Sequence, residues 1–333
     1  FGEAGEPWLC PYGGRERQRS VRMDAHRNAR YNCSALIHAM KCFRSLCAIL
    51  LLLPGIFGAG VVSAASVTKS LQWEPFIPHE NEFAAAIVMV PKTHQVLYSF
   101  KPDKPHTAAS LTKLAGAMAF LKKPGSWERL VTITKADEVG GGRLRVDVGT
   151  RIPLRDLFYA SITASANNAA TALARVSGLT MKGFLARMNQ VAKTAGAKNT
   201  VFYDAAGMNP KNVTTARDMA LLSEAAFNLP EIRRAATVET YPVRIASVGQ
   251  VRTIKNTNPL LAPHTGVWVL GGKTGYLEES MYNFVGRFRP ELADGSSELG
   301  KDVIIVVLGA PTKDAQFQTA KRLAQWAWRV HEF

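Results

Sequence analysis

The chain has 333 residues, of which 47% are hydrophobic, and a formal net charge of +15. This composition excludes a disordered or fibrous protein and predicts one large or two moderate globular domains. The positive charge favours polyanions in general, but the Lys and Arg residues form no basic run interleaved with aromatic residues. We therefore expect a basic, solvated surface and no nucleic-acid partner.

The N-terminal 39 residues differ in composition from the rest of the chain. They are rich in arginine, lack hydrophobic periodicity and begin with Phe1. We interpret residues 1–39 as a non-native or disordered N-terminal extension, with Met23 and Met40 as possible starts of translation.

Residues 40–65 have the pattern of a signal peptide. A positive segment is followed by an apolar run over 46–57 and by small residues that suit cleavage after Ala64 or Ala65. The run contains Pro and Gly and is shorter than the ~20 apolar residues of a membrane span, so cleavage is favoured over anchoring. We expect a periplasmic or secreted protein. All four cysteines precede residue 48, so the mature chain would have neither disulfides nor thiolates.

The order of elements in residues 66–333 predicts an α+β fold. Strand patterns occur at both ends and helical patterns in the middle, so we expect an antiparallel sheet from both chain ends and an inserted helical lobe. One catalytic domain would comprise 66–333, with the sheet part at about 66–109 and 238–333 and the helical lobe at about 110–237. The predicted strands are 84–90, 95–100, 130–134, 239–245, 251–255, 266–274, 283–288 and 303–308; the predicted helices are 110–123, 154–162, 168–176, 181–194, 215–227 and 313–331.

Ser110 and Lys113 are the first candidate catalytic residues. A Ser-x-x-Lys spacing at the start of a helix places a hydroxyl and an amine one turn apart. Lysine can activate the serine if burial or a nearby positive charge lowers its pKa. The spacing alone is weak support, because Ser66 and Lys69 show it too.

Ser165 and Asn167 form a second candidate pair at a turn before an Ala-rich helix. The serine could relay a proton to a leaving amine, and the amide could orient Lys113 and the substrate. The alternative is a helix cap, because both residue types favour N-cap positions.

Lys273, Thr274, Gly275 and Tyr276 form a third candidate group beside a predicted strand. The cation and the hydroxyl can hold a substrate carboxylate, and Gly275 leaves room for the approach of a backbone. The N–H of Tyr276 could supply an oxyanion donor. The alternative is a turn with a surface lysine.

The three motifs occur together and in the order Ser-x-x-Lys, Ser-x-Asn, Lys-Thr-Gly, which is the set of penicillin-binding proteins and class A β-lactamases. The stretch from about residue 84 to 333 resembles the low-molecular-mass penicillin-binding proteins, the D-alanyl-D-alanine carboxypeptidase and endopeptidase family. Further matching segments are Gly141–Leu144, Val148–Thr150, Asp156–Leu157, Asn168–Ala170 and Thr215–Ala220.

The resemblance implies a β-lactamase/transpeptidase-like fold and a carboxypeptidase that acts on peptidoglycan stem peptides ending in D-Ala-D-Ala. Ser110 would form the acyl-enzyme, Lys113 would be the base, and Ser165 and Asn167 would assist. Lys273 and Thr274 would bind the terminal carboxylate. No metal or organic cofactor is implied, and β-lactams would be covalent inhibitors.

Several alternatives remain. A D,D-endopeptidase that cuts D-Ala cross-links would use the same groups, whereas a non-catalytic wall-binding protein would not need all of them. A class A β-lactamase would need a glutamate where 199–209 offers only Asp204, and a P-loop would need a glycine at Val267. The chain ends after its last predicted helix, so we expect no stable membrane anchor.

Overall fold

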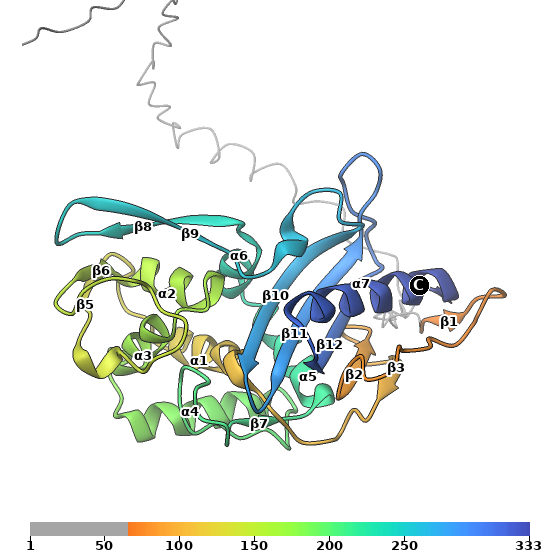
Figure 1. Ribbon diagram of the computed structural model, residues 1–333, viewed down its shortest axis with the longest axis horizontal. Helices are drawn as coiled ribbons and strands as arrows, with labels where there is room; N and C mark the ends of the chain where they lie inside the picture. Colours follow the sequence, from red (N-terminus) through yellow and green to blue (C-terminus); the bar gives the residue numbers. More distant parts are fainter. Residues whose placement is uncertain (1–65) are drawn as a thin grey trace, which may run out of the picture. The chain divides into compact units, whose positions relative to one another are not determined.

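The computed structural model describes residues 66–333, and the predicted N-terminal extension and signal peptide lie outside this range. The main sheet has five antiparallel strands in the order β10-β11-β12-β2-β3, so strands from both ends of the chain pair with one another (Figure 1). This arrangement confirms the predicted α+β class. The bounds are β2 Ala85–Met89, β3 Val96–Phe100, β10 Val267–Leu277, β11 Met281–Pro290 and β12 Val303–Ala310.

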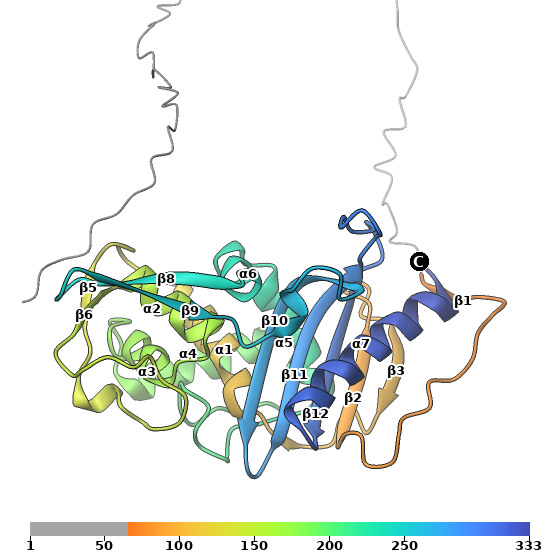
Figure 2. The same ribbon diagram turned by 45° about the horizontal axis from the view of Figure 1, so that its top comes forward.

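The central strands are apolar on both faces because both faces are covered. In β12, Ile304 and Val306 face the helical lobe, whereas Val303 and Ile305 pack towards helix α7, Lys313–Val330. Figure 2 shows α7 lying across β11, β12 and β2. A doubly covered strand reads as a continuous hydrophobic run, which is how the sequence of β12 appears.

The middle of the chain forms the helical lobe on the opposite face of the sheet from α7. Its core is rich in alanine, which lets helices approach closely. Helix α6 had not been predicted, although its sequence has Pro at the first helical position and apolar residues at three- and four-residue spacing. The helices are α1 Thr112–Leu121, α2 Leu154–Thr163, α3 Asn167–Arg175, α4 Met181–Thr194, α5 Ala216–Phe227 and α6 Pro230–Thr237, with 3-10 turns at Ala109–Leu111, Lys135–Asp137 and Pro259–Leu261.

The predicted strands at 239–245 and 251–255 form a separate hairpin, β8 (Thr240–Ile245) and β9 (Gln250–Lys255). They lie within the range assigned to the sheet part, but they pack on α2 of the helical lobe. The reason is local: Val243 and Ile254 are buried in the lobe core, and Tyr241 stacks on Tyr159 with ring centroids 3.9 Å apart. Three further pairs of short strands are β1 Thr68–Lys69 with β13 His331–Glu332, β4 His106–Thr107 with β7 Val213–Thr214, and β5 Leu130–Thr132 with β6 Arg151–Pro153.

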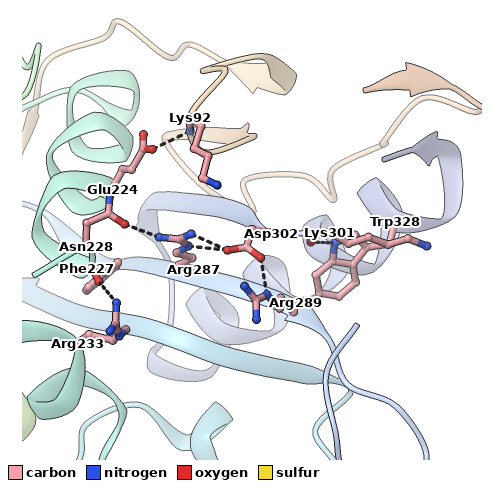
Figure 3. A network of polar contacts seen from close by, with 10 residues as sticks. All are labelled: Lys92, Glu224, Phe227, Asn228, Arg233, Arg287, Arg289, Lys301, Asp302 and Trp328. Carbon is pink, nitrogen blue, oxygen red and sulfur yellow. Dashed lines mark hydrogen bonds and ion pairs between the residues drawn. The ribbon is translucent and has the colours of Figure 1, made fainter. Parts of the chain in front are cut away.

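A polar network ties the end of α5 to the sheet (Figure 3). Arg287 on β11 donates to Asn228 at 2.9 Å and to Asp302 at 2.6 and 2.9 Å, and Asp302 also pairs with Arg289. Glu224 on α5 accepts the backbone N–H of Lys92 at 2.7 Å. These contacts fix the lobe against the sheet, and therefore fix the relative positions of motifs carried by the two parts.

Candidate active site

Ser110 lies in the 3-10 turn Ala109–Leu111, which leads directly into α1. Ala109 has a φ of +48°, an uncommon conformation for a residue with a side chain. Two glycines pack against this turn. A Cβ on Gly207 would lie 2.1 Å from the Ala109 carbonyl oxygen, and one on Gly275 would lie 3.3 Å from the Ser110 nitrogen. The strained turn is thus held from both sides, with the Ser110 hydroxyl facing the cleft.

Lys113 is only 1% exposed and lies one turn into the same helical segment. Its Nζ is 2.7 Å from Ser110 Oγ, 2.7 Å from Asn167 Oδ1 and 2.5 Å from the carbonyl oxygen of Ala206. Burial lowers the pKa of Lys113 to about 7, and the negative charge of Asp204 opposes that shift. A pKa near neutrality makes the neutral amine accessible at pH 7, as a general base requires.

Asp204 organises the loop that carries the carbonyl oxygen of Ala206, which is the backbone contact of Lys113. Its carboxylate accepts backbone N–H groups from Ala206 at 2.8 Å, Gly207 at 2.5 Å and Asn209 at 2.5 Å. This geometry holds the Ala206 carbonyl against Lys113. Sequence reasoning had considered Asp204 only as a poor substitute for a β-lactamase glutamate; the Asp-x-x-Gly spacing was a usable turn signal.

Ser165 and Asn167 occupy the junction between α2 and α3. The N-cap position of α3 is Ala166, without a side-chain cap, so the pair does not serve as the cap that was the alternative interpretation. Ser165 has a φ of +57°. Asn167 donates through Nδ2 to the Gly140 carbonyl at 2.8 Å, which fixes its Oδ1 toward Lys113.

Lys273 lies within β10 and is 1% exposed. Its Nζ donates to Ser165 Oγ at 2.7 Å and to the Thr274 carbonyl at 3.0 Å. Burial, reinforced by the positive charge of Lys113, holds the pKa of Lys273 well below its usual value. Because Lys273 is part of a strand and not of a loop before a helix, the P-loop alternative is wrong.

The remaining residues of the third motif border the cleft. Thr274 Oγ1 donates to Thr257 Oγ1 at 2.7 Å, and the half-exposed ring of Tyr276 lies 4.5 Å, centroid to centroid, from Tyr282. β10 is the edge strand of the sheet on the side of the helical lobe (Figures 1 and 2). Its unpaired edge therefore faces the cleft between the sheet and the lobe.

All three motifs converge on one cavity of about 820 Å³. Lys113 and Lys273 are buried behind this lining and reach it through hydrogen bonds to Ser110, Asn167 and Ser165. By contrast, the second Ser-x-x-Lys match lies elsewhere: Ser66 is exposed, and the ammonium of Lys69 sits 3.7 Å over the ring of Trp73. Within residues 66–333, no three His, Cys, Asp or Glu side chains gather as metal ligands would. The cavity is lined by Ser110, Gly141, Gly142, Ala164, Ser165, Asn167, Met208, Asn256, Thr257, Pro259, Thr274, Gly275, Tyr276, Leu277, Glu278, Tyr282, Lys313, Asp314, Gln316 and Phe317.

A family model described as D-alanyl-D-alanine carboxypeptidase matches residues 74–312. The chain belongs to this family. It is similar to D-alanyl-D-alanine endopeptidases of Pseudomonas aeruginosa (31% identical, covering 79% of this chain and 83% of that protein) and Escherichia coli (29%, covering 84% and 86%). Among solved structures, the Streptomyces K15 DD-transpeptidase matches with a TM-score of 0.66 at 26% identity, covering 77% of this chain and 100% of that one.

Membership in the D-alanyl-D-alanine carboxypeptidase family confirms the resemblance seen in the sequence, the transpeptidase-like fold and the prediction of a serine hydrolase. The predicted carboxypeptidase activity and its endopeptidase alternative both fit this family and its relatives. No helix in the described part of the chain is long and apolar enough to cross a membrane.

Proposed function

We propose that Ser110 forms an acyl-enzyme with the penultimate D-Ala of a bacterial cell-wall peptide and that Lys113 is its general base. The observation that carries this proposal is the 2.7 Å contact between Lys113 Nζ and Ser110 Oγ, together with a Lys113 pKa of about 7. A neutral amine donates two hydrogen bonds and accepts one. Asn167 and Ala206 provide the two acceptors, so the lone pair faces the serine hydroxyl.

In the first half-reaction, Ser110 Oγ attacks the carbonyl carbon of the D-Ala and transfers its proton to Lys113. The oxyanion is stabilised by the backbone N–H groups of Ser110 and Tyr276, because these donors lie where the glycine at 275 allows β10 to approach the nucleophile. The proton taken up by Lys113 is relayed through Ser165 to the leaving amine as the C–N bond breaks, which leaves Lys113 and Ser165 in their starting states. Water then attacks the ester and releases the acyl product from Ser110.

Lys273 and Thr274 bind the carboxylate that follows the scissile bond. Lys273 is buried, without an acidic partner among the described residues, and its charge is opposed by Lys113. A substrate carboxylate would supply the missing negative charge and raise the pKa of Lys273 on binding. This coupling favours substrates with a free carboxylate next to the cleaved bond.

Cleavage of D-Ala cross-links, rather than only release of terminal D-Ala, is the activity we assign to this site. The relatives from P. aeruginosa and E. coli, similar over more than four-fifths of their length, are endopeptidases. The cavity of about 820 Å³ also extends past Ser110 in both directions, from Gly141 on the helical lobe to Lys313 on α7. A cross-link needs room on both sides of the bond, whereas a D-Ala leaving group needs little.

Such a substrate lies outside the cytoplasm, in agreement with the predicted signal peptide. β-Lactams would acylate the same serine, Ser110.

The test is incubation of the purified enzyme with cross-linked muropeptide dimers and, separately, with a monomeric pentapeptide. We expect dimers to be converted to monomers at a higher kcat/KM than that for D-Ala release. Release of D-Ala without dimer cleavage would leave the acyl-enzyme proposal standing and overturn the endopeptidase assignment. Inertness toward both substrates and toward a fluorescent penicillin would overturn both.

A further inference from the structure

A second, smaller pocket adjoins the catalytic cleft. Its volume is about 360 Å³, and Ala164, the residue before Ser165, lines both spaces. Two other segments also run from one space to the other: Gly142 lines the cleft and Arg143 the small pocket, and the β9 strand continues from the small pocket to Asn256 in the cleft. The small pocket is therefore a side branch of the cleft on the helical-lobe wall. Its lining is Arg143, Leu144, Arg145, Ala164, Arg252 and Ile254.

The register of the hairpin explains why an arginine points into this branch. Arg252 lies opposite Val243, and Ile254 lies opposite Tyr241. Paired residues share a face, and residues two apart along a strand do as well. Since Val243 and Ile254 are buried against the lobe, the exposed side chain of Arg252 starts from the same inward face of the hairpin.

Two of the three arginines have no opposing charge in contact. Arg143 is engaged by Glu138 at 2.7 Å. Within residues 66–333, neither Arg145 nor Arg252 forms an ion pair, and no carboxylate side chain lines the branch. Two uncompensated guanidinium groups facing one small pocket produce a positive potential beside an enzyme cleft.

We propose that this branch binds a second carboxylate of the wall peptide, distinct from the one held by Lys273 and Thr274. The inference rests on the proposed function, because it requires a peptide lying across Ser110. The planar, bidentate guanidinium is suited to carboxylates. A branch of about 360 Å³ is too small for a separate macromolecule. The terminal carboxylate of the peptide is bound by Lys273 and Thr274 on β10. The carboxylate bound in the branch would therefore belong to a residue that precedes the scissile D-Ala in the peptide.

The test uses two peptides of equal length that end in D-Ala-D-Ala. One contains a γ-linked glutamate with a free α-carboxylate, and the other contains its amide. For the wild type we expect kcat/KM to be about tenfold higher for the acid, with the ratio falling as salt is added. In the Arg145→Ala/Arg252→Ala double variant, the acid-to-amide ratio should fall to about one.

Lys198→Ala is the matched control, because Lys198 is an exposed cation outside both pockets. It should keep the wild-type ratio. An equal ratio in the wild type and the double variant would overturn the carboxylate branch, as would a similar fall in the Lys198→Ala control. If the wild type cleaves neither peptide and is not labelled by a fluorescent penicillin, the proposed function itself fails, and the branch proposal fails with it.

Discussion

Replacing Asn167 by aspartate should move the pH dependence of acylation upward. The side chain keeps its size, but Oδ1, 2.7 Å from Lys113 Nζ, becomes part of a carboxylate. An opposite charge at this distance favours the ammonium form and raises a pKa by roughly 1–3 units. The pKa of Lys113, about 7 in the wild type, would then lie between roughly 8 and 10.

The direction of the effect follows from the role of the amine. Only neutral Lys113 can take the proton of Ser110, so a higher pKa removes the active form at neutral pH and restores it in alkali. At pH 7 the acylation rate constant should drop about fivefold to five-hundredfold, depending on where in that range the pKa falls. Raising the pH should recover much of the lost rate.

The assay is the second-order rate constant for labelling by a fluorescent penicillin, measured from pH 5.5 to 10. Gln190→Glu, on the exposed face of α4, adds the charge without approaching Lys113 and should keep the wild-type profile. Circular dichroism would establish that both variants fold. A folded Asn167→Asp variant with its midpoint still near 7 would refute Lys113 as the titrating base.

Three further substitutions test the geometry. Gly207→Ala should abolish most acylation, because its Cβ would lie 2.1 Å from the Ala109 carbonyl; Gly178→Ala, with a similar φ and open space, should cost only about 1 kcal/mol and keep activity. Thr274→Val should raise KM about tenfold for a peptide with a free terminal carboxylate, and an unchanged KM in steady-state kinetics would argue against carboxylate binding there. Replacing Asp137, a fully buried partner of half-exposed Arg175, by alanine should lower the free energy of unfolding by about 2–3 kcal/mol in urea titrations; a loss below about 0.5 kcal/mol would contradict the assigned ion pair.

The main sheet could be predicted because its strands have strong signals. β12 is a run of apolar residues covered on both faces, and α7 has an apolar stripe that matches one of those faces. The hairpin at 240–255 was predicted as two strands but was wrongly assigned to the sheet part. Its alternation showed that one side is buried, yet alternation does not say against which element. Packing on α2 depends on contacts such as Tyr241 with Tyr159 that are distant in sequence.

The motif residues of the candidate site could be predicted from the sequence, whereas the residues that position them could not. The sequence indicated Ser110, Lys113, Asn167 and Lys273 by motif order, and the structure brings them together in one cleft. The spacing of Asp204 and Gly207 indicated a turn. The contact that this turn makes with Lys113 was not accessible, because Asp204 acts through backbone groups whose positions depend on the fold. The basic branch was missed for a similar reason: its arginines come from a loop and from a hairpin more than 100 residues away.

The central claim is that Ser110 is the nucleophile of a penicillin-sensitive D,D-peptidase, and intact-mass spectrometry with peptide mapping tests it most directly. After incubation with benzylpenicillin, the wild type should gain the mass of one penicillin on the peptide that contains Ser110, and Ser110→Ala should gain none. An adduct on any other residue, an adduct that persists in Ser110→Ala, or no adduct on the folded wild type would contradict the account.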